Sequence, residues 1–323
     1  MRAIQISRTG GPDVLTPVEL PDPEPGPGQL LVDVAAAGVN YIDTYQRDGT
    51  YPMPLPYVPG LEGAGRVRAV GAGVTEFAVG DRVAWAEALG SYAERAAVPA
   101  DKAVPVPDDV SDEAAVGALL QGMTAHFLVN DTHEVRPGED LLVHAAAGGV
   151  GLLLTQMAAA KGARVIATVS TAEKEALARA AGAAEVIRYT EVPDLAAAVR
   201  ELTGGEGVAV AYDSVGRTTF DASLASLRRR GLLVLFGASS GPVPPVDPQR
   251  LNAAGSMFLT RPKLFDHVVT RDELTARAAA VFADVAKGTL DVRIGGRYPL
   301  ADAPRAHEDL QSRRTTGKLL LLP

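Results

Sequence analysis

The chain has 323 residues, of which 31 are basic and 39 acidic, so its formal net charge is −8. Hydrophobic residues make up 47% and charged residues 22%, which is the balance of a globular protein and excludes a disordered chain. The acidic excess argues against a nucleic-acid partner, and the absence of cysteine excludes disulfides, thiolate catalysis and cysteine-ligated zinc. No segment resembles a secretory signal or a membrane span, so we expect a cytoplasmic protein with no membrane partner.

The first third of the chain is predicted to be rich in β-strands. Clusters of glycine and proline, such as 21–28, separate short segments of β-branched or alternating apolar residues. The predicted strands are 3–6, 30–36, 63–70 and 82–85. This pattern favours an irregular, partly open barrel.

From residue 111 onward, predicted strands alternate with predicted helices. The strands are 140–145, 164–169, 185–187, 208–213, 231–236 and 256–260. The helices include one that follows a glycine-rich turn after the first of these strands and ends near 161, and further ones over 171–181, 193–202, 217–227 and 273–287. The basic run Arg228–Arg230 is interpreted as the end of a helix. Such alternation is typical of an α/β fold with a doubly wound parallel sheet. We therefore expect one domain over 123–262, and a β-rich domain over 1–122 to which 263–323 returns.

A glycine-rich segment, His144–Gly151, stands between a predicted strand and a predicted helix. Gly148 and Gly151 are in register with the dinucleotide-binding pattern G-x-G-x-x-G, whereas Ala146 replaces its first glycine. Such a turn lets the backbone approach a pyrophosphate at a helix N-terminus. The alternative is a glycine-rich turn that binds nothing.

The end of the next predicted strand indicates which dinucleotide is bound. NAD-binding proteins carry an acidic residue there for the ribose 2′-hydroxyl, but this chain has Ser170 and, one helical turn later, Lys174. These side chains suit a 2′-phosphate, so NADPH is favoured over NADH. Glu173 is the observation against this interpretation.

The first domain lacks the residues that would hold a catalytic zinc. The segment Gly60–Gly63 resembles the zinc-binding segment of medium-chain alcohol dehydrogenases, but Leu61 stands where their histidine ligand would be. Asn40 stands where their first cysteine ligand would be. Without a metal to activate an alcohol, the substrate must accept hydride readily by itself, as quinones and activated enones do.

Together these features resemble a known family, the zinc-free quinone oxidoreductases of the medium-chain dehydrogenase/reductase superfamily, which includes zeta-crystallin. The segments that carry the resemblance are 37–45, Arg47, 49–52, 59–63, 80–83, 121–126, 145–151, 213–216, 236–241, 260–262 and 314–318. The resemblance covers nearly the whole chain. It implies a Rossmann NADP-binding domain, a GroES-like second domain, NADPH as cofactor and a homodimer.

The resemblance also implies the residues of the site. Asn40 and Tyr45 would lie beside the nicotinamide, Gly148, Gly149 and Val150 at the pyrophosphate, and Ser170, Lys174 and Tyr189 at the 2′-phosphate. Further contacts would come from Ser214, Phe236, Gly237, Ala238, Ser239, Phe258, Leu259, Thr260, Arg313 and Lys318. Arg314 is an alternative to its neighbour Arg313.

The expected reaction is hydride or electron transfer from NADPH to a quinone. Tyr45 and Tyr51 are the candidate hydrogen-bond donors to the quinone oxygen, and Asn40 is a candidate to polarise it. The alternative roles are cofactor packing for Tyr45 and a loop aromatic for Tyr51. An enone or enoyl reductase is the alternative activity, and a non-catalytic NADPH-binding structural or sensor protein is the alternative of a different class.

Overall fold

The computed structural model describes residues 1–323 and divides into two compact units. Unit 1 comprises Met1–Met123 and His267–Pro323, and unit 2 comprises Thr124–Asp266. None of the helices is both long and apolar enough to cross a membrane.

Unit 2 is built on a six-stranded sheet in which every pairing is parallel. The strands are β8 (Asp140–Val143), β9 (Arg164–Val169), β10 (Glu185–Arg188), β11 (Val208–Asp213), β12 (Leu227–Leu235) and β13 (Phe258–Thr260). Their spatial order, β10-β9-β8-β11-β12-β13, is the 3-2-1-4-5-6 order of a Rossmann fold. The predicted doubly wound parallel sheet is therefore confirmed.

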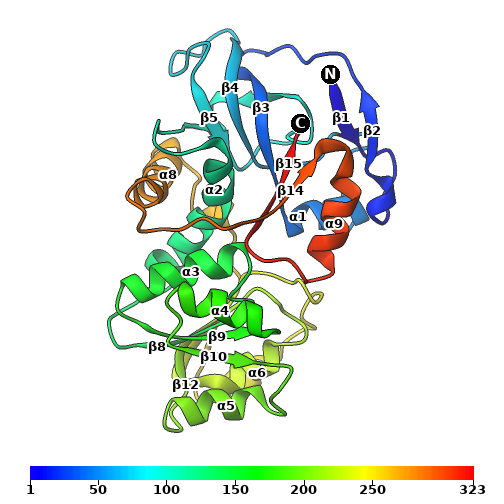
Figure 1. The fold of residues 1–323 in the computed structure, drawn as a ribbon. Helices are drawn as coiled ribbons and strands as arrows, with labels where there is room; N and C mark the ends of the chain where they lie inside the picture. Colours follow the sequence, from blue (N-terminus) through cyan, green and yellow to red (C-terminus); the bar gives the residue numbers. More distant parts are fainter. The chain divides into compact units, whose positions relative to one another are not determined.

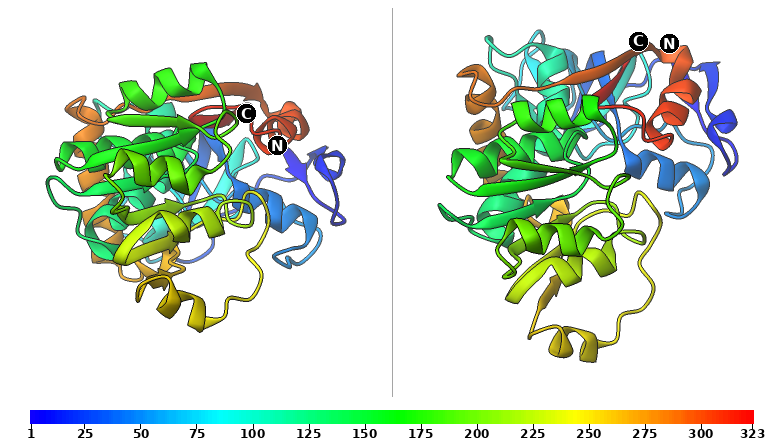
Figure 2. Two further views of the ribbon diagram at one scale, coloured as in Figure 1. Left: turned by 90° about the horizontal axis from the view of Figure 1, so that it is seen from below. Right: turned by 60° about the horizontal axis from the view of Figure 1, so that its bottom comes forward.

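Helices cover both faces of this sheet, as Figures 1 and 2 show. The helices α3 (Gly149–Ala160) and α4 (Ala172–Ala180) pack on one face, and α5 (Leu195–Leu202) and α6 (Phe220–Ser226) on the other. A short helix, α7 (Pro248–Ala253), precedes β13. The central strands β8, β9 and β11 are almost wholly buried and apolar on both faces, which is the pattern that made them recognisable in the sequence.

Strand β12 begins earlier than predicted, and the interpretation of Arg228–Arg230 as a helix end is wrong. These arginines belong to β12, where their side chains are exposed. The register explains the difference: Val208 of β11 pairs with Leu227, but Val210 pairs with Leu232, so β12 bulges between them. The bulge carries the arginines into solvent while Leu227 remains in the core.

Unit 1 contains a seven-stranded sheet and a separate two-stranded one. The strands are β1 (Arg2–Gln5), β2 (Thr16–Glu19), β3 (Gln29–Val39), β4 (Gly63–Val70), β5 (Arg82–Trp85), β6 (Arg95–Pro99), β7 (Ala103–Pro105), β14 (Ile294–Pro299) and β15 (Lys318–Leu322). The larger sheet runs β14-β15-β3-β4-β5-β7, with β6 also pairing with β3. The C-terminal strand β15 thus pairs directly with β3, which brings residue 318 close to residue 40.

Four helices accompany these strands. They are α1 (Tyr41–Asp48), α2 (Asp112–Phe127, which crosses the boundary between the units), α8 (Arg271–Ala286) and α9 (Ala303–Gln311). Helices α1 and α9 were not predicted from the sequence. Helix α1 is short and polar, and a capping box formed by Asn40 and Asp43 marks its start.

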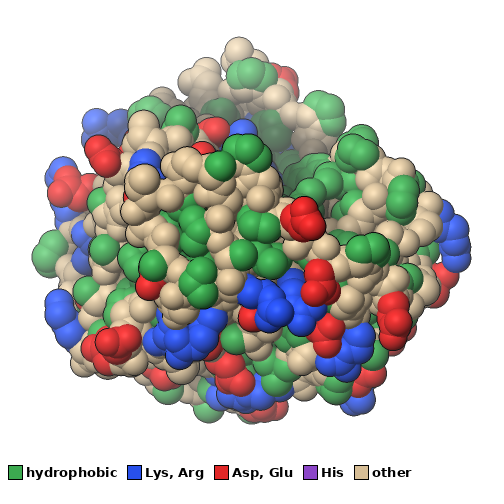
Figure 3. All heavy atoms as spheres, turned by 90° about the horizontal axis from the view of Figure 1, so that it is seen from above, with side chains coloured by type: hydrophobic (Ala, Val, Ile, Leu, Met, Phe, Trp, Pro, Cys, Tyr) green, Lys and Arg blue, Asp and Glu red, His purple; other side chains and the backbone are tan.

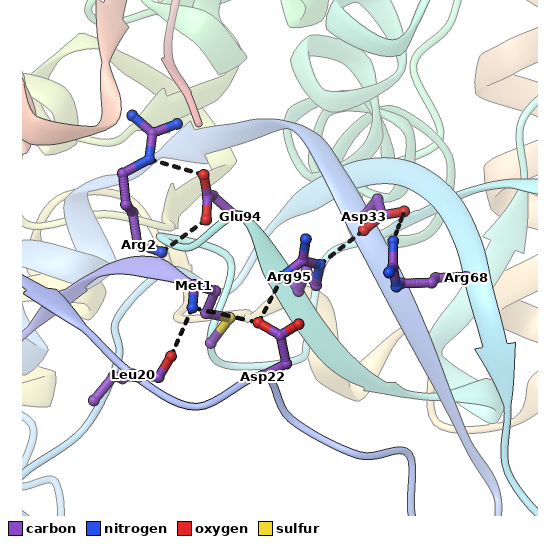
Figure 4. A network of polar contacts seen from close by, with 8 residues as sticks. All are labelled: Met1, Arg2, Leu20, Asp22, Asp33, Arg68, Glu94 and Arg95. Carbon is purple, nitrogen blue, oxygen red and sulfur yellow. Dashed lines mark hydrogen bonds and ion pairs between the residues drawn. The ribbon is translucent and has the colours of Figure 1, made fainter.

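Charged side chains tie the N-terminal strands of unit 1 together at its surface (Figure 4). Arg95 on β6 bonds Asp22 at 2.5 Å and Asp33 at 3.1 Å, and Arg68 on β4 reaches Asp33 at 3.4 Å. The Met1 ammonium lies 3.3 Å from Asp22. Pairs as exposed as these contribute little stability one by one.

Candidate cofactor and substrate site

The glycine-rich turn joins β8 to α3 at the carboxyl end of the unit 2 sheet. A Cβ at Gly151 would lie 2.3 Å from the carbonyl oxygen of Ala145, so only glycine allows α3 to pack this closely. Ala145 itself adopts a left-handed conformation, with φ of 50°.

The N-terminus of α3 is open to an anion. Gly148 is the N-cap and contributes no side-chain hydrogen bond, and the first turn holds no acidic residue. The first N–H groups of a helix lack partners within it, and their dipoles favour negative charge. The predicted pyrophosphate residues Gly148, Gly149 and Val150 form this N-terminus, so the turn fits a dinucleotide.

The residues predicted for the 2′-phosphate meet at the ends of two neighbouring strands. Ser170 follows β9 and Tyr189 follows β10, and the last residues of these strands pair with each other. Lys174 lies in the first turn of α4, which Thr171 caps by accepting a hydrogen bond from the Lys174 N–H at 3.3 Å. Burial lowers the pKa of the half-buried Lys174, and neighbouring Glu173 opposes this change.

The segments after β11 and β12 approach each other closely. Ser214 directly follows β11, and its carbonyl oxygen accepts a hydrogen bond from the Ser239 N–H at 3.3 Å. A Cβ at Gly237 would lie 2.4 Å from that same oxygen. The predicted segment Phe236–Ser239 therefore lies against Ser214 at the carboxyl end of the sheet.

Residues Phe258–Thr260 form β13, the outermost strand of the sheet. Thr260 pairs with Val234 near the carboxyl end of β12, whereas Phe258 pairs with Leu232. The Phe258 side chain is 60% exposed. Of these three predicted cofactor contacts, Thr260 lies nearest the edge that bears the phosphate turn.

In unit 1, Asn40 is buried and its side chain is held by three others. Its Oδ1 accepts hydrogen bonds from Gln121 Nε2 at 2.6 Å and from Lys318 Nζ at 2.8 Å. Its Nδ2 donates to Glu62 Oε2 at 3.1 Å. Because an ammonium can only donate, Lys318 determines which way the Asn40 amide faces.

Lys318 and Glu62 form an ion pair that is 2% and 0% exposed, respectively. The second carboxylate oxygen of Glu62 accepts a hydrogen bond from the Leu120 N–H at 3.0 Å. The structure thus directs the Lys318 ammonium toward Asn40 and Glu62. Contact between Lys318 and the cofactor stays a prediction.

Three tyrosines form a row along α1 and the loop after it. The ring centroids of Tyr45 and Tyr51 are 5.6 Å apart in an edge-to-face arrangement, and those of Tyr41 and Tyr45 are 6.4 Å apart. Tyr51 is 44% exposed, and its N–H donates to the Tyr45 carbonyl oxygen at 2.9 Å. Tyr45 and Tyr51, the two predicted substrate contacts, are therefore neighbours in space.

Tyr41, Glu62 and Gln121 belong to this site in unit 1 but were not predicted. Burial raises the pKa of Tyr41, and the positive charge of Arg313 opposes this change. Arg313 follows α9 with φ of 58°. Nothing in the spacing of residues 41, 62 and 121 marks them. Glu62 and Gln121 come together at the Asn40 side chain, and Tyr41 packs against Tyr45 and donates to the Leu310 carbonyl oxygen at 3.0 Å.

No group of three or more histidine, aspartate or glutamate side chains comes together in a way that could hold a metal ion. Asn40 and Leu61, which occupy the positions where zinc ligands would stand, are an amide bonded to its neighbours and a buried apolar side chain.

Comparison with known proteins places the chain among oxidoreductases. Residues 26–108 match the alcohol dehydrogenase GroES-like domain, and residues 149–280 match the family described as zinc-binding dehydrogenase. Quinone oxidoreductase 1 of Escherichia coli is 47% identical over 324 residues, covering 99% of each chain. The chain belongs to the quinone oxidoreductases of the medium-chain dehydrogenase/reductase superfamily. The predicted family and GroES-like domain are thereby confirmed.

Solved structures extend this family relationship. A mycobacterial protein complexed with NADPH is 56% identical, with a TM-score of 0.97 and full coverage of both chains. The E. coli quinone oxidoreductase complexed with NADPH is 46% identical, with a TM-score of 0.98 and full coverage of both chains. The family neighbourhood also includes a 2-haloacrylate reductase from a Burkholderia species, 42% identical over 99% of this chain and 98% of its own.

Proposed function

We propose that the protein is an NADPH-dependent quinone reductase that works without zinc. The observation that carries the proposal is the open N-terminus of α3 behind a turn that only Gly151 permits, in a full-length relative of quinone oxidoreductases. Structures of family members with NADPH bound support the choice of cofactor, as do Ser170 and Lys174 at the end of β9 and the start of α4.

In this proposal the protein binds the cofactor and the quinone and orients them toward each other, and NADPH supplies the hydride when it is bound. The α3 N-terminus holds the pyrophosphate, and Ser170, Lys174 and Tyr189 hold the 2′-phosphate. Tyr45 and Tyr51 donate hydrogen bonds toward the oxygen that gains charge on the substrate. Reduction of a quinone needs no strong acid in the protein, because a hydroquinone anion takes its proton from water.

Asn40 contributes by position rather than as a free donor. Both donors of its Nδ2 are already used, on Glu62 at 3.1 Å and on the Gly38 carbonyl oxygen at 3.4 Å, and its Oδ1 accepts two hydrogen bonds. We infer that the surrounding side chains hold the Asn40 amide and the start of α1 in place, so that Tyr41 and Tyr45 are presented at a constant angle.

Oxidation of NADPH with a panel of acceptors tests this function. The panel contains 1,4-benzoquinone, 9,10-phenanthrenequinone and 2-cyclohexenone, with NADH run in parallel. Fast turnover of a quinone with preference for NADPH is expected. Equal rates with NADH would overturn the cofactor assignment. NADPH binding with no turnover of any acceptor would favour a structural or sensor role.

Reduction of an activated alkene is the second candidate activity, because one relative is a 2-haloacrylate reductase. Both activities deliver hydride to an electron-poor carbon next to a polarised oxygen. Turnover of 2-cyclohexenone without turnover of either quinone would move the proposal to this activity.

We also propose that the protein is a homodimer joined through the edge of the unit 2 sheet. Strands β10 and β13 are the two edge strands of this sheet, and β13 bears the exposed Phe258 side chain. An unpaired strand edge is a template for pairing. Light scattering should give twice the chain mass of 33.6 kDa. The monomer mass for the native chain would reject the dimer.

The cytoplasm is the location we propose, because NADPH is regenerated there. Fractionation of cells that express the chain should recover NADPH-dependent quinone reductase activity in the cytosolic fraction; recovery with membranes would contradict this.

A further inference from the structure

A chain of buried polar side chains crosses the carboxyl ends of three neighbouring strands in unit 2. Its members are Thr168 on β9, His144 directly after β8, Ser223 on α6 and Asp213 at the end of β11. Each is less than 3% exposed. None of these four side chains has a role in the candidate site described above.

The direction of every hydrogen bond in this chain follows from Asp213. Its two oxygens accept from the Val215 and Gly216 N–H groups and from the Thr219 and Ser223 hydroxyls, at 2.7–2.9 Å. Because the Ser223 hydroxyl donates its hydrogen bond to Asp213, the Ser223 oxygen must accept one from His144 Nε2–H, 2.9 Å away.

The remaining ring nitrogen is therefore an acceptor. Burial lowers the pKa of His144, so the ring is neutral and carries one proton, on Nε2. His144 Nδ1 then accepts the hydroxyl proton of Thr168 at 2.9 Å. Hydrogen bonds are thus donated in one direction, from Thr168 to His144, from His144 to Ser223 and from Ser223 to Asp213. A single tautomer of His144 satisfies all four side chains.

This polarity excludes nucleophilic catalysis by Ser223. In a hydrolase the histidine accepts the serine proton, whereas here the histidine donates and the carboxylate takes the serine proton. Ser223 is also fully buried, so no substrate can reach its oxygen.

This row of hydrogen-bonded side chains connects the three strand ends that carry the predicted cofactor segments. His144 begins the phosphate turn, Thr168 lies two residues before Ser170, and Asp213 precedes Ser214. Backbone hydrogen bonds run alongside: the His144 N–H donates to the Tyr212 carbonyl at 3.1 Å, and the Ala146 N–H to the Thr168 carbonyl at 3.2 Å. A shift of any one strand end would break the side-chain contacts.

We propose that His144 is a positioning residue for the cofactor: with Thr168, Ser223 and Asp213 it holds the three turns in the arrangement that binds NADPH. The inference rests on the proposed NADPH-dependent function. Its physical basis is preorganisation, since a turn already held in its binding geometry loses less freedom when the ligand arrives. His144 touches no reacting atom and is not a catalytic residue.

Helix α6 offers a matched pair of variants. Ser223→Ala removes the hydroxyl that joins His144 to Asp213. Ser226→Ala removes an equally buried hydroxyl from the same helix, one that bonds only to the Ala222 carbonyl oxygen. Titration of NADPH fluorescence gives Kd for both, and steady-state rates give KM for NADPH, KM for the quinone and kcat.

Ser223→Ala should raise Kd and KM for NADPH about tenfold, which is the size of effect expected for the loss of one buried hydrogen bond. It should change kcat at saturating NADPH less than about twofold. Ser226→Ala should leave Kd unchanged. The split between KM and kcat matters because a merely structural loss would lower the active fraction, and so kcat, without changing Kd.

Two outcomes would overturn the inference: native Kd in Ser223→Ala, or an equal rise of Kd in Ser226→Ala. Failure of the native protein to bind NADPH would instead overturn the proposed function. Should Ser223→Ala not fold, Thr168→Val and Thr168→Ser decide the question. The valine variant should weaken NADPH binding and the serine variant, which keeps the hydroxyl, should restore it; equal affinities would reject the inference.

Discussion

The Lys318 ammonium and the Glu62 carboxylate lie at the centre of the unit 1 site, almost wholly shielded from water. Transfer of two charges out of water is costly, so the pair is stable only while each partner remains. Asn40 and the Leu120 N–H satisfy the other polar positions around them. This small cluster fixes the direction of the Asn40 amide.

Breaking the pair from one side should therefore be strongly destabilising. Lys318→Met leaves the Glu62 carboxylate buried without a counter-charge, and we expect it to lower the free energy of unfolding by about 3–5 kcal/mol. The double variant Lys318→Met/Glu62→Gln should recover part of that loss. Urea denaturation measures both. A single variant as stable as the native protein would contradict the burial of this pair.

Tyr45 tests the proposed chemistry at the scale of one hydroxyl. If the tyrosine only donates a hydrogen bond to the quinone oxygen, Tyr45→Phe should lower quinone turnover less than about tenfold. A general acid is worth more, typically a factor of about 100 to 10,000. Steady-state turnover with benzoquinone gives the answer, and a loss greater than about a thousandfold would show that Tyr45 is an obligatory proton donor.

A second buried network in unit 1 contributes to the pH dependence of stability in two opposite ways. Arg47 donates to His307 Nδ1 at 3.0 Å, so His307 Nε2–H donates to the Tyr92 oxygen and the Tyr92 hydroxyl to Asp43 Oδ2, each at 3.0 Å. Burial raises the pKa of Asp43 to about 7 and lowers that of His307 to about 3. Both groups are thus neutral over the mildly acidic range.

The two shifts have opposite consequences. Between its ordinary pKa of 3.8 and about 7, folded Asp43 holds a proton that the unfolded chain has lost, so stability falls as pH rises. Between about 3 and 6.5, folded His307 lacks a proton that the unfolded chain has gained, so stability rises with pH. Where the two ranges overlap, their contributions cancel.

Asp43→Asn should expose the His307 contribution. Between about pH 4 and 6.5, the stability of the variant relative to the native protein should rise with pH, with a slope approaching about 1.4 kcal/mol per pH unit, because the opposing contribution of Asp43 is removed. Urea midpoints across that range measure the slope. Asp48→Asn, an exposed residue on the same helix, is the control and should follow the native profile. Identical profiles for Asp43→Asn and the native protein would contradict the raised pKa of Asp43.

At the scale of elements, the turn between β8 and α3 depends on one glycine. Gly151→Ala would place a methyl group 2.3 Å from the Ala145 carbonyl oxygen, so α3 must move away from the strand. We expect a loss of about 1–3 kcal/mol in unfolding free energy and at least about a tenfold weaker affinity for NADPH. Gly148→Ala, where the same contact would be 3.2 Å, should cost less stability. Denaturation and NADPH titration of both variants test this order.

Elements with a local pattern could be predicted from the sequence, and those made by distant contacts could not. The strands of unit 2 are continuous apolar runs separated by helices, so the sheet was foreseen. Helix α1 was missed because its capping box joins polar residues at its start and its buried face is itself polar: Asp43, Thr44, Gln46 and Arg47. The bulge in β12 was missed because it exists only relative to β11.

The same distinction holds for the site. Gly148 to Gly151 carry a local motif, and the structure places them at an open helix N-terminus. The contacts of Asn40 with Gln121 and Lys318 span 81 and 278 residues of sequence. The pairing of β15 with β3 brings Lys318 to Asn40, and helix α2 supplies Gln121. A resemblance could nominate Asn40 and Lys318, but their bonding to each other needed the fold.

At the scale of the whole molecule, the negative net charge of the protein opposes the approach of an anionic cofactor. The net charge is −8, and on the face in Figure 3 basic and acidic side chains lie interspersed. The protein as a whole therefore does not attract NADPH from a distance. Affinity for its phosphates must come from local features, namely the α3 N-terminus and the cation at the start of α4.

Lys174→Ala tests that local contribution. NADPH carries a 2′-phosphate and NADH does not, so the variant should raise Kd for NADPH by about tenfold or more and Kd for NADH by less than about twofold. Lys161→Ala, which changes a lysine at the C-terminal end of α3, is the control and should leave both constants unchanged. Fluorescence titration with both dinucleotides measures the four values. If Lys174→Ala weakened NADPH and NADH equally, Lys174 would support the fold of α4 and the preference for NADPH would lie with Ser170 and Tyr189.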